Sequence, residues 1–105
     1  MNTPADQPAD HFEHKPLEVL RATVTGRVQG VGFRATAVDI AKRYPVTGRV
    51  RNLPDGRVQL LVEGPEAEVS RFLDAVRSHW GKHIERVKTE GREPTGKYRD
   101  FAVAR

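Results

Sequence analysis

The sequence predicts an α+β sandwich in which two helices cover one face of an antiparallel sheet. Two observations support this prediction. Apolar and polar residues alternate in several short segments, as in half-buried strands, and two longer segments between them repeat their apolar residues at helical spacing. The predicted order is strand, helix, strand, strand, helix, strand, followed by a short extra strand. This order is that of a ferredoxin-like split βαβ fold.

The first strand is predicted over residues 17–25, where apolar and polar side chains alternate. The first helix is predicted over residues 33–44, because its apolar residues share one face and its charged residues point away. Pro45 is expected to end this helix, since proline disfavours helical backbone in the residue before it. A second strand follows from Val46 to Asn52, and Asn52 is in phase with the inward-facing residues of that strand.

The second half of the chain begins with turn residues at 53–56, which predict a hairpin to a third strand over residues 57–63. The second helix is expected to begin with Pro65 at its first position and to end at Gly81. Its apolar stripe, which we interpret as core, consists of Val69, Phe72, Leu73, Val76 and Trp80. The remaining strands are predicted over residues 84–89 and 98–103.

The length and composition of the chain limit the kinds of protein to which it can belong. A chain of 105 residues fits one domain, and the absence of cysteine fits a reducing, cytoplasmic compartment, which is the location we expect. No apolar run is long enough for a membrane span, so no membrane partner is expected.

The first 16 residues differ in composition from the rest of the chain. Residues 1–16 contain three prolines, three acidic residues and one lysine, with few apolar residues, which predicts a disordered N-terminal arm before a folded domain of residues 17–105. The whole chain carries a net charge of +4 and the arm carries −2, so the folded domain carries +6. A basic domain favours an anionic partner.

The segment from Gly26 to Arg34 is a glycine-punctuated loop between the first strand and the first helix. A helix N-terminus presents unpaired backbone N–H groups and the positive end of the helix dipole, which together bind phosphate or carboxylate. Glycines at positions 26, 30 and 32 let the backbone approach such a ligand, and Arg34 adds a planar set of charged donors. The spacing is not that of a P-loop. The alternative is a tight turn without a ligand, in which Arg34 is solvated.

The predicted topology brings Asn52 close to this loop. The first two strands are expected to be parallel with the third strand between them, so their carboxyl ends share one edge of the sheet. Two strand spacings amount to roughly 10 Å, which lets Arg34 and Asn52 reach one small ligand. The alternative is that Asn52 caps the hairpin turn.

Two motifs in this region resemble those of the acylphosphatase family. They are Arg27-Val28-Gln29-Gly30-Val31-Gly32-Phe33-Arg34 and Gly48-Arg49-Val50-Arg51-Asn52-Leu53-Pro54-Asp55-Gly56. The later segments Val62-Glu63-Gly64-Pro65 and Phe101-Ala102-Val103 are similar as well, so the resemblance covers residues 18–105. Many members of the family carry an aromatic residue at the position of Arg49 and a bulkier one at that of Thr36, and neither position serves the chemistry.

The resemblance implies hydrolysis of a small acyl phosphate to a carboxylate and inorganic phosphate. It implies that Arg34 binds the phosphoryl group, that Asn52 positions the attacking water, and that backbone amides of the loop complete the phosphate site. The loop residues concerned are Gln29, Gly30, Val31, Gly32 and Phe33. Such a reaction needs charge stabilisation and an oriented water, so neither a metal nor another cofactor is expected. Inorganic phosphate and sulfate are expected to compete with the substrate.

Two other classes of function are the alternatives. One is a catalytically silent domain of the same family that binds anions. The other is a nucleic-acid-binding module, since RNA-recognition domains share the predicted element order. Such modules stack bases on exposed aromatic side chains, whereas the outward strand positions here are mostly Arg, Thr, Gln and Glu, with Leu61 as the main exception. We therefore expect no nucleic-acid partner, and we expect a monomer because no exposed apolar stripe is evident.

Overall fold

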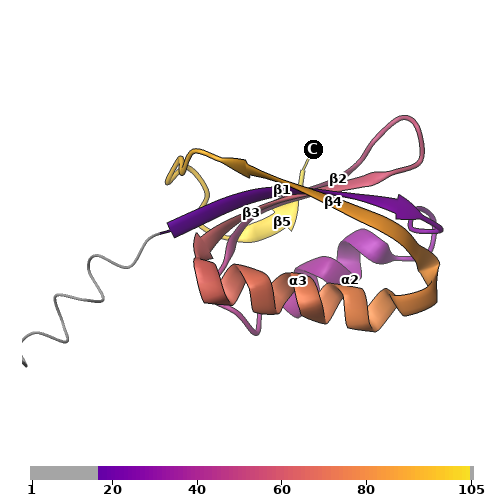
Figure 1. The fold of residues 1–105 in the computed structure, drawn as a ribbon, viewed down its shortest axis with the longest axis horizontal. Coiled ribbons are helices and arrows are strands. Elements are labelled where there is room, and N and C mark those ends of the chain that lie inside the picture. Colours follow the sequence, from indigo (N-terminus) through magenta and orange to yellow (C-terminus); the bar gives the residue numbers. More distant parts are fainter. Residues whose placement is uncertain (1–16, 105) are drawn as a thin grey trace, which may run out of the picture.

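The computed structural model describes residues 17–104, and the predicted arm of residues 1–16 lies outside them. The elements follow the predicted order (Figure 1). They are β1 (Leu17–Gly26), α2 (Phe33–Ala41), β2 (Thr47–Asn52), β3 (Val58–Pro65), α3 (Glu66–Trp80), the short 3₁₀ helix η1 (Gly81–His83), β4 (Ile84–Arg92) and β5 (Phe101–Val103). Within the described residues, no helix combines the length and apolar character needed to cross a membrane.

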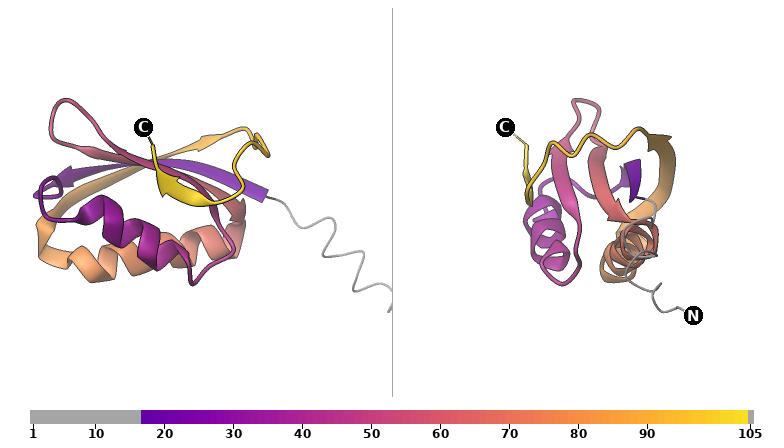
Figure 2. Two further views of the ribbon diagram at one scale, coloured as in Figure 1. Left: turned by 180° about the vertical axis from the view of Figure 1, so that it is seen from behind. Right: turned by 90° about the vertical axis from the view of Figure 1, so that its left-hand side faces the viewer.

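The strands of residues 17–104 form one sheet in the order β4-β1-β3-β2-β5. The pairs β4–β1, β1–β3 and β3–β2 are antiparallel, whereas β5 pairs with β2 in parallel, so the sheet is mixed. Both helices lie against the same face of the sheet, as Figure 1 and the further views of Figure 2 show. The predicted ferredoxin-like α+β sandwich is confirmed, and the parallel pairing of the last strand is an addition to it.

The core lies between the sheet and the two helices, where the apolar faces predicted from the sequence meet. The stripe of α3 is buried as expected, with Val69 and Phe72 fully inaccessible. Aromatic contacts join the layers: ring centroids lie 5.1 Å apart for Phe72 and Phe101, and 5.3 Å apart for Phe33 and Trp80. Burying one large apolar side chain contributes about 1.5–3 kcal/mol. Core packing therefore holds the start of α2, where Phe33 lies.

Two boundaries of the helices differ from the predicted ones. The first helix ends at Ala41 rather than at residue 44, because the N–H groups of Arg43 and Tyr44 bond to carbonyls three residues back in a tighter 3₁₀ turn. Pro65 is the N-cap of α3 and also the last residue of β3, so its predicted place at the first helical position was wrong by one residue. The bounds of β1, β2 and β3 agree with the prediction to within two residues.

Residues 93–100, here called the crossing segment, connect the two edges of the sheet across its helix-free face (Figure 2). Backbone that crosses a face cannot pair with an edge strand, so β5 begins at Phe101, three residues later than predicted. β4 in turn continues to Arg92, three residues beyond the prediction, because it stays paired with β1 as far as Val19.

Glu63 of β3 holds the crossing segment in place. Its carboxylate is buried and accepts hydrogen bonds from the Thr95 hydroxyl at 3.1 Å and from the Gly96 backbone N–H at 2.9 Å. These bonds are needed because burying a charge without partners is strongly unfavourable. Nearer to β5, Asp100 forms an ion pair with Arg49 of β2 at 2.9 Å. Both contacts determine where the crossing segment meets the edge of the sheet.

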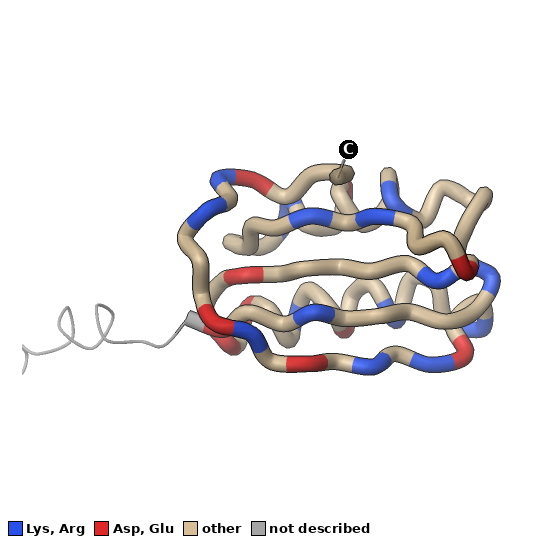
Figure 3. Tube along the Cα trace, turned by 90° about the horizontal axis from the view of Figure 1, so that it is seen from above, with Lys and Arg blue, Asp and Glu red and all other residues tan. Residues whose placement is uncertain are grey.

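Lysine and arginine residues are spread over several strands of the sheet rather than gathered in one stripe (Figure 3). Acidic side chains offset some of them: Arg21 of β1 pairs with Glu90 of β4 at 3.0 Å, and Arg49 pairs with Asp100. Tyr98 of the crossing segment contacts the Arg49 guanidinium at 4.8 Å from its ring centroid. The expectation of no nucleic-acid partner rests on this polar surface and stays a prediction.

Replacing Thr95 by valine removes the hydroxyl that donates to Glu63 and keeps the size of the side chain. We expect the free energy of unfolding to fall by about 1–2 kcal/mol, because a buried carboxylate oxygen loses a partner. Urea denaturation followed by circular dichroism measures this change. Thr89→Val makes the same change at an exposed position of β4 and is expected to alter stability by less than about 0.5 kcal/mol. Equal losses in the two variants would contradict the role given to Thr95.

Candidate active site

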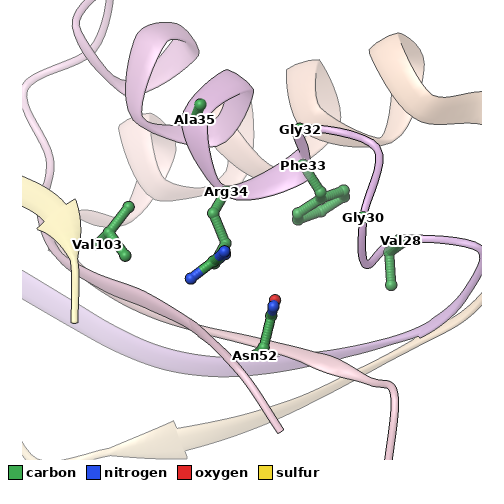
Figure 4. Close-up of a pocket in the computed structure, with 8 residues that line it drawn as sticks. All are labelled: Val28, Gly30, Gly32, Phe33, Arg34, Ala35, Asn52 and Val103. Carbon is green, nitrogen blue, oxygen red and sulfur yellow. The ribbon is translucent and has the colours of Figure 1, made fainter. Parts of the chain in front are cut away.

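A cavity of about 260 Å³ lies where β2 ends and where the loop after β1 enters α2. Its lining residues are Val28, Gly30, Gly32, Phe33, Arg34, Ala35, Asn52 and Val103 (Figure 4). The structure therefore brings together Gly30, Gly32, Phe33, Arg34 and Asn52, all predicted from the sequence. The other two predicted residues, Gln29 and Val31, do not line the cavity.

Two glycines give the loop its shape. Gly30 and Gly32 have φ angles of +78° and +81°, in the left-handed region where a Cβ costs about 1–2 kcal/mol. Gly32 is also the N-cap of α2, and no side chain caps this helix. The first bond within the helix runs from the Thr36 N–H to the Gly32 carbonyl at 3.0 Å, so the earlier N–H groups of the first turn have no partner inside the helix.

The electrostatics of this helix end favour an anion. The first turn of α2 contains no acidic residue, so no carboxylate neutralises the positive end of the helix dipole. Phe33, the first residue of α2, is 1% exposed and packs against Trp80. Because successive helical residues point about 100° apart, burial of Phe33 turns Arg34 away from the core. Figure 4 shows the Arg34 side chain reaching into the cavity.

Arg34 of α2 and Asn52 of β2 point toward one another across the cavity (Figure 4). None of the ion pairs formed within residues 17–104 involves Arg34. The Oδ1 atom of Asn52 is buried and has no hydrogen-bond partner. Buried polar atoms nearly always have a partner, so an unsatisfied one marks a place for a water or a ligand. One cation and one unsatisfied acceptor therefore face the same space.

The hairpin after Asn52 is closed without the asparagine side chain. The Leu53 N–H bonds to the Arg57 carbonyl at 2.8 Å, and the Asp55 carboxylate accepts bonds from the Arg57 backbone N–H at 3.1 Å and from its Nε at 2.8 Å. The backbone bond from Arg57 is the largest cause that holds the pKa of Asp55 below its ordinary value. The alternative in which Asn52 caps the turn has no support in this geometry.

Gln29 ties the glycine loop to the same hairpin. Its side-chain Nε2 donates to the Leu53 carbonyl at 2.8 Å and to the Arg57 carbonyl at 2.9 Å. One amide group thereby keeps the loop beside the end of β2. These contacts make Gln29 a positioning residue. The participation of its backbone N–H and that of Val31 in phosphate binding stays a prediction.

Arg34 is the one ionisable side chain among the residues that line the cavity. No Asp, Glu or His borders it, and the described residues contain no group of three such side chains that could hold a metal ion. The cavity itself offers backbone N–H groups, a guanidinium and a carboxamide. Such a set binds a tetrahedral oxyanion and orients a water beside it.

The fold and the site together define a class: a small ferredoxin-like domain with a cavity between a helix N-terminus, an arginine and an asparagine. Comparison with known proteins narrows this class to one family. The family model described as Acylphosphatase matches residues 20–103.

Individual acylphosphatases are similar to this protein in sequence or structure over most of its chain. An acylphosphatase of Chloroflexus aurantiacus is 41% identical over 90 residues, which span 83% of this chain and 98% of the relative. An acylphosphatase of Roseiflexus sp. is 40% identical over 92 residues, which span 83% of this chain and 97% of the relative. The crystal structure of acylphosphatase from Bacillus subtilis has a TM-score of 0.77 and 32% identity, covering 86% of this chain and 100% of that chain. The chain belongs to the acylphosphatase family and is an acylphosphate hydrolase.

Three residues that line the cavity were not among the predicted site residues. Val28 lies within the glycine loop, Ala35 follows it directly, and Val103 comes from β5. Val28 is 1% exposed and contributes to the core. The sequence shows Val103 as part of a closing apolar segment, and its place beside the cavity follows from the parallel pairing of β5 with β2.

Replacing Gln29 by methionine keeps the length of the side chain and removes the donor to two hairpin carbonyls. We expect the free energy of unfolding to fall by about 1–2 kcal/mol, and phosphate to bind roughly three- to tenfold more weakly because the loop is no longer preorganised. Chemical denaturation and calorimetric titration with phosphate measure these effects. Gln59→Met makes the same change on the helix-free face and is expected to keep the phosphate affinity. Unaltered phosphate binding by Gln29→Met would rule out the positioning role.

Proposed function

We propose that this protein hydrolyses small acyl phosphates in the cavity between Arg34 and Asn52. Arg34 and the N–H groups of the glycine loop bind the phosphoryl group, and Asn52 orients the attacking water. The observation that carries this proposal is the buried Asn52 Oδ1, which has no hydrogen-bond partner and lies opposite Arg34. Membership in the acylphosphatase family supports the class of substrate.

The phosphoryl group is held by charge and by directed N–H groups. A phosphoryl group attached through one oxygen carries about −1.5 to −2 charges at neutral pH. The guanidinium of Arg34 offers two parallel donors to its oxygens, and the N–H groups at the start of α2 add further donors. As the reaction proceeds, charge spreads over the three equatorial oxygens, and the same groups stabilise it. Because these donors belong to the protein itself, we expect no metal requirement.

Asn52 acts on the water. Its Oδ1 accepts a hydrogen bond from the water and so directs a lone pair of the water oxygen toward phosphorus. A bond forms between that oxygen and phosphorus while the bond from phosphorus to the acyl oxygen breaks, and the carboxylate leaves with the electron pair. No carboxylate or imidazole borders the cavity, so the proton of the water passes to a phosphoryl oxygen. The products are a carboxylate and inorganic phosphate.

The oligomeric state, the location and the partners of the enzyme are also part of the proposal. The monomeric state, the cytoplasmic location and the absence of a macromolecular partner stay predictions from the sequence. Acetyl phosphate and carbamoyl phosphate are the small acyl phosphates that we propose as test substrates.

Turnover of acetyl phosphate in a buffer that contains EDTA tests the proposed function. We expect hydrolysis, and we expect inorganic phosphate and sulfate to raise the apparent KM without lowering kcat, because they occupy the same N–H groups as the substrate. A colorimetric assay of the remaining acyl phosphate measures both. Phosphate binding without turnover would favour the catalytically silent alternative. Turnover that requires added magnesium or zinc would overturn the metal-independent mechanism.

Arg34→Ala removes the cation from the cavity. We expect kcat/KM to fall by about 10²- to 10³-fold, which corresponds to about 2.7–4 kcal/mol, and phosphate to bind more weakly. Arg34→Lys is expected to recover part of the loss, because an ammonium cannot form two parallel bonds. Arg51→Ala on the helix-free face is the control and is expected to retain activity. Similar rates in Arg34→Ala and Arg51→Ala would show that Arg34 does not bind the phosphoryl group.

Asn52→Ala removes the acceptor for the water. We expect kcat to fall by about 10²-fold or more while phosphate keeps nearly its original affinity, because Asn52 contacts the water rather than the phosphoryl group. The variant is also expected to be at least as stable as the wild type, since it removes a buried polar atom that has no partner. Kinetics, phosphate titration and thermal unfolding measure the three quantities. Nearly full turnover by the folded variant would disprove the assigned role.

A further inference from the structure

Val103 of β5 is unusual among the apolar side chains of the domain. Within residues 18–104, the large hydrophobic side chains that are exposed are Val31, at 46%, and Val103, at 38%. Val103 lines the cavity, whereas Val31 does not. In Figure 4, Arg34 lies between Val103 and the glycine loop. The cavity therefore continues past the guanidinium toward β5.

The fold holds Val103 firmly at this position. Val103 pairs with Val50 of β2 in the parallel ladder, and the following residue, Ala104, donates its backbone N–H to the Val50 carbonyl at 2.9 Å. At the start of β5, Phe101 packs on Phe72 of α3. The exposed valine is thus part of an ordered wall of the cavity.

The cavity extends beyond the space between Arg34 and Asn52, because Val103 of β5 also lines it. The part beyond Arg34 is bordered by the apolar side chain of Val103.

We propose that Val103 forms an apolar subsite for the acyl group and makes the enzyme select acyl phosphates with an apolar acyl substituent over those with a polar one. This inference rests on the proposed function. With the phosphoryl group on the loop N–H groups and Arg34, the acyl substituent extends toward Val103. Acetyl and carbamoyl phosphate have nearly the same shape and differ in a methyl group against an amino group. Beside valine the amino group loses hydrogen bonds to water and gains no acceptor, whereas the methyl group loses none.

The test compares acetyl and carbamoyl phosphate in the wild type and in Val103→Thr. Threonine has the shape of valine, favours strands, and carries a hydroxyl that can accept a hydrogen bond from the amino group. We expect the ratio of kcat/KM for acetyl phosphate to that for carbamoyl phosphate to fall about three- to tenfold, the net effect of one hydrogen bond. Comparing ratios between proteins cancels the different intrinsic reactivities of the two substrates.

Val87→Thr makes the same change at a partly exposed valine of β4 outside the cavity and is expected to keep the wild-type ratio. Val103→Thr is expected to keep the wild-type inhibition constant for inorganic phosphate, since phosphate lies at the loop end of the cavity. An unchanged ratio in Val103→Thr, or an equal shift in Val87→Thr, would overturn the subsite and leave hydrolysis itself in place. A wild-type protein that hydrolyses neither substrate would overturn the proposed function as well.

Discussion

The active site depends on one hydrogen-bonded row that crosses three strands. Val58 of β3 pairs with Val24 of β1 on one side and with Asn52 of β2 on the other. Neighbouring strands lie about 4.8 Å apart, so this row places Asn52 about 10 Å from the end of β1, where the chain enters the glycine loop. A slip of one residue in either pairing would turn the Asn52 side chain to the opposite face of the sheet. The register of β3 is therefore what brings the asparagine to the cavity.

Core packing supplies the stability that the polar groups of the site do not. Val28 and Phe33 of the glycine loop are buried on either side of Gly30 and Gly32, so apolar contacts hold the backbone at the cavity. Asn52 Oδ1 lacks a partner, and an unsatisfied buried acceptor costs about 1–3 kcal/mol. The surrounding core offsets this cost. A binding site that is rigid before the ligand arrives needs no further ordering when the ligand binds.

We propose that the two ends of the substrate are recognised by different parts of the fold. In this proposal the phosphoryl end lies at the start of α2, and the acyl end lies toward β5, the strand added to the edge of the split βαβ unit. Glu63 and Arg49 hold the crossing segment that leads into β5. Contacts on the helix-free face thus determine the position of a cavity wall. In this proposal, substitutions in β5 alter acyl selectivity and leave the phosphate site intact.

Local pattern was enough to predict the order of the elements and the faces that they bury, because alternation and helical spacing directly reflect which side chains meet the core. It also predicted that Arg34 and Asn52 share a site, since a helical crossover between parallel strands brings their carboxyl ends to one edge. The end of α2 at Ala41 was not predicted, because a change from α-helical to 3₁₀ hydrogen bonding hardly alters the spacing of the apolar residues.

Contacts between distant segments were decided by the tertiary structure alone. Gln29 bonds to Leu53 and Arg57, which lie 24 and 28 residues further along the chain, and periodicity carries no information about such a pair. The crossing segment and the parallel pairing of β5 likewise depend on which edge of the completed sheet is free. The sequence by itself determined the fold class and predicted the polar side chains of the candidate site. The tertiary structure decided that Gln29 holds the glycine loop beside the hairpin and that Val103 lines the cavity, because both positions follow from packing across the sheet.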